Sequence, residues 1–284
     1  MDFTEEALVG GLRGSLLRPE RSSGTGVVVL GGSSGRVDLV RAGLFAKRGV
    51  LAIAMRWFGG EGQSPGICEI PIETFSQAID RLREEGCDRI GFVGTSKGAE
   101  AALLVASYDL RVDVVVAISP SSVVWANVGP GRDGFDWPLR SSFTRGGLPF
   151  AFVPHAAEAL LSVNRLPPVR YLEFFQESLR TFAGHLVPAA IPVERSRAEI
   201  VLVAGGDDAL WPSAVFAEAL SARLTAHGKV ASLVIHPAAG HRVLLPGETT
   251  PKSTVNAHGG TDEADRELGS TAWREIARLF RFGS

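Results

Sequence analysis

The sequence has 284 residues and a mass of 30.1 kDa, with 45% hydrophobic and 21% charged residues. This is the composition of an ordinary globular protein, and it excludes disordered and fibrous classes. Lys+Arg 29 against Asp+Glu 31 gives a net charge of −2, which excludes a general attraction to nucleic acid or to an anionic membrane. We expect no secretory signal, because the first residues are acidic and lack an apolar run, and no apolar run in the sequence is long enough to span a membrane. We expect one soluble, cytoplasmic domain over residues 1–284.

The two cysteines, Cys68 and Cys87, are too few for a disulfide framework and are not clustered as metal ligands would be. We expect reduced thiols, at least one of them buried as a small apolar residue. The sequence therefore predicts a protein without a metal or another cofactor.

Short apolar runs alternate with helix-length segments, which is typical of βαβ units and a mostly parallel sheet. An antiparallel hairpin is predicted first, over Ala7–Arg18. The strands are continuous apolar runs, as expected when helices cover both faces of a sheet, and lie at Val27–Leu30, Val50–Ala54, Arg89–Val93, Val112–Ile118, Ile200–Ala204 and Ala231–Ile235. Helices are predicted at Val37–Lys47, Ile72–Glu85, Ala99–Ser107, Ser213–His227 and Ala272–Arg281.

Residues 126–195 interrupt this alternation. The segment opens with a Gly/Pro/Asp-rich stretch and continues through the helix-like YLEFFQESLRTF between proline-rich flanks. Long interruptions of a regular α/β pattern are typical of lids or substrate-binding insertions, the alternative being a surface excursion with its own small core. Five arginines make the segment basic, at positions 132, 140, 145, 165 and 170. They could meet substrate phosphates, with Arg132, Arg140 and Arg145 as the candidate ligands, unless they only form a solvated surface.

The pentapeptide GTSKG (residues 94–98) lies directly between the predicted strand Arg89–Val93 and the predicted helix Ala99–Ser107. G-x-S-x-G in this setting is the signature of a nucleophile elbow, in which a tight turn lifts the serine off the end of the strand. The N-terminal amides of the following helix favour negative charge at the same place. We predict that Ser96 is a nucleophile, the alternative being a glycine-rich turn with an inert serine.

A nucleophilic serine needs a histidine base and an acid that orients it, in the chain order Ser, Asp/Glu, His for this motif. His241 lies in a loop directly after the predicted strand Ala231–Ile235 and is the best placed of six histidines. The others have structural or surface interpretations: His155 and His185 in the insertion, His227 at a helix end, His236 at a strand end and His258 in a polar loop. Asp207 and Asp208 follow the preceding strand, and either carboxylate could orient His241.

An oxyanion hole requires two backbone N–H groups. We expect one from Lys97, the residue after the nucleophile, and the other from Gly32 or Ser33. These two residues belong to the loop GGSSG, which follows the predicted strand Val27–Leu30 and whose small side chains let the backbone approach a substrate carbonyl.

The same loop offers an alternative, because VVVLGGSSG resembles the opening of a short-chain dehydrogenase, where a glycine-rich turn holds a pyrophosphate. Val37 stands where that fingerprint expects its next glycine. Neither Tyr108 nor Tyr171 is followed four residues later by the lysine of that family. The glycine pattern alone is a weak match, and the dehydrogenase hypothesis is disfavoured.

Four segments resemble the catalytic domain of acyl-CoA thioesterases and bile-acid-CoA:amino acid N-acyltransferases, namely GFVGTSKGAEAALLVASY, VVVAISPSSVVW, IVLVAGGDDALWPS and HPAAGHRVLLP. The resemblance covers nearly the whole chain. It implies an α/β-hydrolase fold, similar to dienelactone hydrolases, with a mostly parallel central sheet, helices on both faces and a lid-like insertion. It also implies that Ser96 is the nucleophile, that Asp208 rather than Asp207 is the acid, and that His241 is the base.

Two departures from the family pattern bear on function. Animal members carry an N-terminal β-sandwich domain for which this chain has no room, and the amidating members use cysteine where this chain has Ser96. The serine favours hydrolysis, so the resemblance implies a hydrolase (EC 3.1 class) that cleaves acyl thioesters such as acyl-CoA through an acyl-enzyme. The alternatives are a carboxylic-ester or lactone hydrolase, an acyltransferase to an amine or alcohol, and a non-catalytic scaffold that only binds a ligand.

Overall fold

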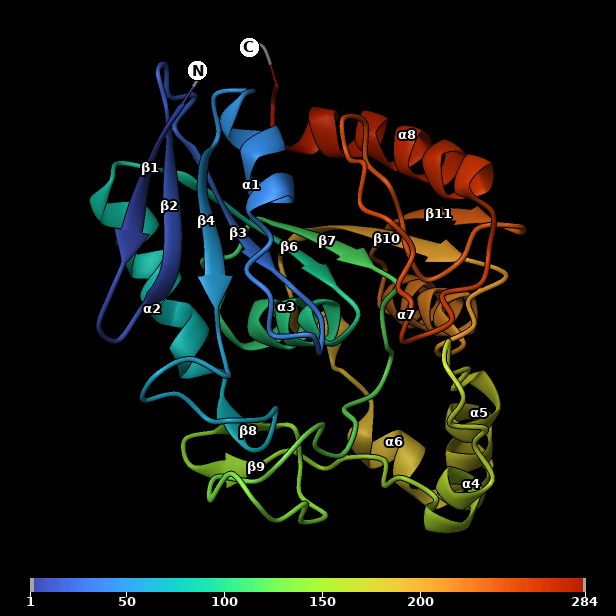
Figure 1. Ribbon diagram of the computed structural model, residues 1–284. Coiled ribbons are helices and arrows are strands. Elements are labelled where there is room, and N and C mark those ends of the chain that lie inside the picture. The colour runs from blue at the N-terminus through green and yellow to red at the C-terminus, as the bar shows by residue number, and fades with distance from the viewer. Residues whose placement is uncertain (1–2, 283–284) are drawn as a thin grey trace.

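The computed structural model describes residues 3–282. Over this range the chain forms a central eight-stranded sheet in the order β1-β2-β4-β3-β6-β7-β10-β11 (Figure 1). β1 (Phe3–Leu8) and β2 (Arg13–Pro19) form the predicted lead-in hairpin, and β2 pairs antiparallel with its neighbour β4. The other strands run parallel to one another: β3 (Thr25–Leu30), β4 (Leu51–Arg56), β6 (Arg89–Thr95), β7 (Val114–Ile118), β10 (Glu199–Gly205) and β11 (Ser232–His236). The predicted mostly parallel sheet is confirmed.

Helices cover both faces of this sheet, as the continuous apolar strands predict. α1 (Leu39–Ala46) and α8 (Asp262–Leu279) pack on one face, and α2 (Glu73–Glu84), α3 (Lys97–Tyr108) and α7 (Ser213–Ala226) on the other (Figure 1). Alternate residues of β3 enter the two cores, with Val28 and Leu30 on the α3 side and Val27 and Val29 on the α8 side. A strand that is buried on both sides has no polar face, which explains its sequence.

Three predicted helix starts were wrong, and the first of these helices, α1, begins at Leu39 rather than Val37. α8 begins at Asp262 rather than Ala272, because its first half is polar and shows little apolar periodicity. Thr261 caps this end by accepting a hydrogen bond from the backbone N–H of Ala264 at 3.1 Å, and acidic residues occupy the first turn, where the helix dipole favours them. α3 begins at Lys97 rather than Ala99, directly after Ser96.

Residues 126–195 form a separate layer at the carboxyl-terminal side of the sheet, in the lower part of Figure 1. β8 (Phe143–Arg145) pairs with β9 (Leu148–Pro149) and with β5 (Ile70–Pro71) in a small sheet. The helices are α4 (Ala157–Leu161), α5 (Leu172–Thr181) and α6 (Leu186–Ala189), with 3₁₀ turns at Ala183–His185 and Val193–Arg195. Trp125, Val153 and Ala189 form an apolar cluster with Trp211 and Phe216 of the main body. The segment is therefore packed onto the sheet domain. In residues 3–282, no helix is long and apolar enough to cross a membrane.

A half-buried histidine in this layer, His155, gives a prediction about how stability depends on pH. Burial and the nearby charge of Lys97 lower the pKa of His155 to about 4, and its Nε2 has no hydrogen-bond partner within the described residues. Because the unfolded chain binds a proton at the ordinary pKa of about 6.5, the free energy of unfolding should fall by about 3 kcal/mol as pH drops from 6.5 to 4. Denaturant titrations at several pH values in this range give the free energy of unfolding as a function of pH. The slope of that dependence should be shallower for His155→Phe than for wild type. The exposed His185→Phe serves as the control, and equal slopes in both variants would contradict the assignment.

Candidate active site

The nucleophile elbow is built as its sequence motif requires. Ser96 lies between β6 and α3 with φ 57° and ψ −121°, a backbone conformation that non-glycine residues rarely adopt. A Cβ atom at Gly94 would lie 2.1 Å from the carbonyl oxygen of Gly98, and one at Gly98 would lie 2.5 Å from that of Gly31. Only glycine fits these positions, and their close packing holds Ser96 in its strained conformation.

The histidine and one of the two candidate acids form a buried pair. His241 Nδ1 lies 2.8 Å from Asp208 Oδ2, and the two side chains are 7% and 2% exposed. The backbone N–H groups of Leu210 and Trp211 donate to Asp208 Oδ1 at 2.8 and 3.2 Å, and the Ser213 hydroxyl donates to Oδ2 at 2.6 Å. These donors fix the carboxylate, so it can hold the imidazole in one orientation.

Asp207, the other candidate acid, lies on the surface. Its Oδ2 accepts a hydrogen bond from the backbone N–H of Gly260 at 2.9 Å, which closes the loop that precedes α8. The carboxylate in contact with His241 is that of Asp208.

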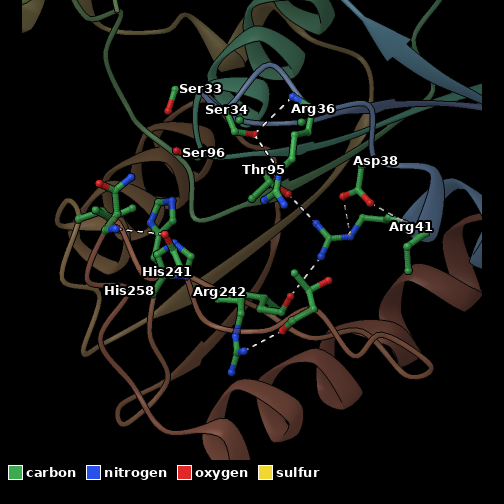
Figure 2. A pocket seen from close by; sticks show the side chains of 18 of the residues that line it. Ser33, Ser34, Arg36, Asp38, Arg41, Thr95, Ser96, His241, Arg242 and His258 are labelled. Atoms are coloured by element: carbon green, nitrogen blue, oxygen red, sulfur yellow. Dashed lines mark hydrogen bonds and ion pairs between the residues drawn. The ribbon is translucent and has the colours of Figure 1, made fainter. Parts of the chain in front are cut away.

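Ser96 and His241 line the same pocket, which has a volume of about 360 Å³ (Figure 2). Gly32 and Ser33 form another part of its wall. A Cβ atom at Gly32 would lie 3.7 Å from the Ser96 hydroxyl oxygen, so the backbone of this loop passes beside the serine. Lys97 begins α3, and N–H groups in the first turn of a helix have no partner within it. Both regions that are predicted to supply oxyanion donors therefore adjoin Ser96.

The structure does not bring the three predicted substrate arginines to this pocket. The Arg132 guanidinium faces Glu69 at 3.9 Å, and the Arg145 guanidinium stacks 4.5 Å from the centre of the Tyr108 ring. Arg140 is exposed, and its backbone N–H donates to Asn127 Oδ1 at 3.2 Å. Spacing along the chain could not show that the basic stretch folds around the small β5–β8–β9 sheet.

Three other arginines line the pocket. Arg41 is paired with Glu248 at 2.8 Å and Arg242 with Asp265 at 3.0 Å. Arg36 is exposed at the pocket wall, and within residues 3–282 its side chain has no ion pair, only a 3.4 Å hydrogen bond to the Ser34 hydroxyl (Figure 2). The only sequence signal for Arg36 is a basic residue directly after the glycine-rich loop.

His258 is a pocket residue that sequence reasoning assigned to a polar loop. Its ring lies 5.9 Å from the His241 ring, centre to centre, and its carbonyl oxygen accepts the backbone N–H of His241 at 2.7 Å. Burial and the neighbouring His241 lower the pKa of His258 to about 4. The side chain is therefore neutral near pH 7 and adds no charge that would oppose a protonated His241.

Both cysteines are free and buried, as predicted. Burial raises the pKa of the Cys87 thiol to about 11 and also raises that of Cys68. Thiols with raised pKa values are poor nucleophiles at neutral pH, so neither residue competes with Ser96 on chemical grounds.

Residues 70–282 match the family described as BAAT / Acyl-CoA thioester hydrolase C terminal. The chain belongs to this family. The match begins before the elbow and ends after α8, so it includes Ser96, Asp208 and His241. The predicted family is confirmed.

Several curated relatives match over almost the whole of this chain. Acyl-coenzyme A thioesterase 2, mitochondrial, of Mus musculus is 29% identical over 95% of this chain and 58% of its own length. Acyl-coenzyme A thioesterase 1 of the same species is 30% identical over 95% and 63%. Acyl-coenzyme A amino acid N-acyltransferase 2 of Rattus norvegicus is 26% identical over 98% and 65%. The chain thus spans about three fifths of the length of these relatives.

Solved structures support the α/β-hydrolase fold. A Klebsiella pneumoniae protein assigned as a dienelactone hydrolase has a TM-score of 0.55 at 14% identity, covering 98% of both chains. The esterase of Pyrococcus furiosus has a TM-score of 0.52 at 14% identity, covering 99% of this chain and 89% of the other. At this level of identity the likeness shows the fold alone.

Proposed function

We propose that this protein hydrolyses acyl thioesters, with acyl-CoA as the substrate class, through Ser96, His241 and Asp208. The observation that carries the proposal is the buried Asp208–His241 pair, which shares a pocket with a serine in a strained strand–helix turn. Membership of a family of acyl-CoA thioester hydrolases supports the thioester as substrate. The names of the thioesterase relatives point the same way.

In the first half of the reaction, the Ser96 hydroxyl oxygen attacks the thioester carbonyl carbon while His241 takes the hydroxyl proton. The resulting oxyanion is held by backbone N–H groups of Lys97 and of Gly32 or Ser33. The tetrahedral intermediate collapses, the C–S bond breaks, and the proton on His241 passes to the leaving thiolate. The products of this half are free CoA and an acyl ester on Ser96.

In the second half, His241 takes a proton from water, and the water oxygen attacks the acyl ester. The C–O bond to Ser96 breaks, and the proton returns from His241 to the serine oxygen. Asp208 remains a carboxylate throughout and stabilises the protonated imidazole. The free acid leaves and the enzyme is restored.

The test is a panel of short-, medium- and long-chain acyl-CoAs beside p-nitrophenyl esters, with free thiol measured for the first group and p-nitrophenol for the second. We expect CoA release that exceeds the uncatalysed rate by several orders of magnitude. Ester turnover without CoA release would contradict the proposal and favour a carboxylesterase. Addition of glycine or taurine, with the N-acyl product measured, separates hydrolysis from acyl transfer.

Arg36 is the arginine of this pocket wall that is free to meet an anionic substrate, since Arg41 and Arg242 are already paired with carboxylates. A guanidinium binds phosphate through charge-assisted hydrogen bonds. We expect Arg36→Glu to raise KM for an acyl-CoA about tenfold, equivalent to about 1.4 kcal/mol. KM for the N-acetylcysteamine thioester of the same acyl group, which lacks phosphates, should stay unchanged.

Arg132→Glu is the matched control, because Arg132 does not line the pocket. An equal change for both thioesters, or none for either, would show that Arg36 does not bind the CoA phosphates. A rise in KM caused by Arg132→Glu would instead support the phosphate-binding role predicted from sequence.

A further inference from the structure

A buried ion pair lies directly behind the nucleophile. Lys97 Nζ lies 2.6 Å from Glu100 Oε2, one turn further along α3, and the two side chains are 3% and 0% exposed. Lys97 Nζ also donates a hydrogen bond to the Ser142 hydroxyl at 2.8 Å. Lys97 is also the residue whose backbone N–H is the predicted oxyanion donor. The far end of its side chain is thus held by Glu100 and Ser142.

The remaining contacts of this pair lead to the segment 125–142, with which the layer on the sheet domain begins. Glu100 Oε1 accepts the backbone N–H of Trp125 at 3.0 Å, and the Ser142 hydroxyl donates to the carbonyl oxygen of Ala126 at 2.9 Å. Trp125 in turn packs against Phe175 of α5 with ring centres 4.9 Å apart. A continuous set of hydrogen bonds therefore joins the first turn of α3 to both ends of the segment 125–142.

A buried ion pair of this kind is expected to add little to the free energy of unfolding. Burial lowers the pKa of Lys97 and raises that of Glu100, which means that removing both groups from water disfavours their charged forms. Buried ion pairs are often replaced by apolar residues of similar volume without loss of stability. Their geometry, in contrast, is highly directional, because every hydrogen bond must be made for the charges to be tolerated.

We propose that Lys97 and Glu100 are positioning residues. By bonding to the segment 125–142, they hold the first turn of α3, and with it the oxyanion donor beside Ser96, in a fixed position. The reacting atoms do not touch either side chain. The pair acts through the backbone N–H of Lys97, whose direction depends on how the first turn of α3 is seated. This inference rests on the proposed acyl-transfer chemistry at Ser96 and adds a route by which the insertion governs the rate of the chemical step.

The main test is the double variant Lys97→Met/Glu100→Gln, which removes both charges at similar size and keeps an oxygen that can accept the backbone N–H of Trp125. We expect its melting temperature to stay close to wild type while kcat falls at least tenfold and KM changes less than threefold. Loss of a whole oxyanion donor lowers kcat by about 10² to 10³, and a misdirected donor should lose a part of that. A purely structural role would not separate kcat from KM in this way.

A second variant keeps the proposal testable if the double variant does not fold. Ser142→Ala removes the hydroxyl that accepts a hydrogen bond from Lys97 Nζ. Ser141→Ala is its control, since Ser141 is equally buried and, within residues 3–282, its hydroxyl accepts only the N–H of Phe143, at 3.3 Å. We expect kcat to fall about threefold or more for Ser142→Ala and to remain unchanged for Ser141→Ala.

A folded double variant with wild-type kcat would overturn the proposal, and so would equal kcat values for the two serine variants. All variants are measured with an acyl-CoA and with a p-nitrophenyl ester. If the wild type hydrolyses only the ester, the thioester function fails, and the kcat ratios for the ester still decide whether Lys97 and Glu100 position the oxyanion hole.

Discussion

Replacement of Ser96 by alanine should lower kcat for acyl-CoA hydrolysis by about 10⁴-fold or more, to the rate left by binding and the oxyanion hole alone. The reason is that the proposed reaction runs through the Ser96 hydroxyl, and the two cysteines are poorly suited to replace it. The buried thiols have raised pKa values, and Ser96 is the serine held at the strand–helix turn. The measurement is thiol release under saturating substrate.

The fold provides the control for this variant. Alanine removes only the hydroxyl, so circular dichroism and the melting temperature should match wild type, and an acyl-CoA should still bind with similar affinity. Turnover by Ser96→Ala close to that of wild type would show that the nucleophile lies elsewhere.

Asp208→Asn should lower kcat by about 10⁴-fold while leaving the protein folded. The carboxylate bonds to His241 Nδ1 at 2.8 Å and holds the ring so that its other nitrogen is available as a base. An amide in its place favours the wrong imidazole tautomer and cannot stabilise the protonated ring. The measurement is kcat by thiol release, with the melting temperature determined in parallel.

Asp207→Asn is the matched control for this second variant. Asp207 is the residue directly before Asp208, is exposed, and its carboxylate accepts the N–H of Gly260. We expect its kcat to stay within about threefold of wild type, as for an ordinary surface substitution. If Asp207→Asn is the slower enzyme, the orienting acid is assigned to the wrong carboxylate.

The mostly parallel sheet and the positions of its strands along the chain were predictable, because runs of apolar residues mark buried strands. β3, β6, β7 and β10 are buried on both faces, so their sequences are continuous apolar runs. The elbow was equally predictable, because its strand, turn and helix are contiguous in the sequence, although Gly98 is required by a distant contact with Gly31. The start of α8 was not predictable. The first half of this helix is polar, and it is stabilised by its N-cap and by acidic residues in the first turn rather than by an apolar face.

The wall of the pocket was the least predictable part of the site. Arg36 and His258 both line the pocket although they lie far apart in the sequence, and neither belongs to a motif. The contact between Lys97 and Ser142 depends on how the insertion packs, which no local pattern encodes. Choosing Asp208 over Asp207 required the family resemblance, and the His241 contact at 2.8 Å agrees with that choice.

The central claim is that a thioester acyl group passes through an ester on Ser96, and it can be tested by mass. A thioester is more reactive than the oxygen ester it forms, so acylation should outrun deacylation and the acyl-enzyme should accumulate. We would mix the wild-type protein with excess acyl-CoA, quench it in acid within milliseconds, and map tryptic peptides. The expected result is a burst of CoA that matches the active-site concentration and an acyl mass on the peptide Ile90–Lys97, which contains Ser96. Steady CoA release with that peptide unmodified, or with the acyl mass on another residue, would contradict the account.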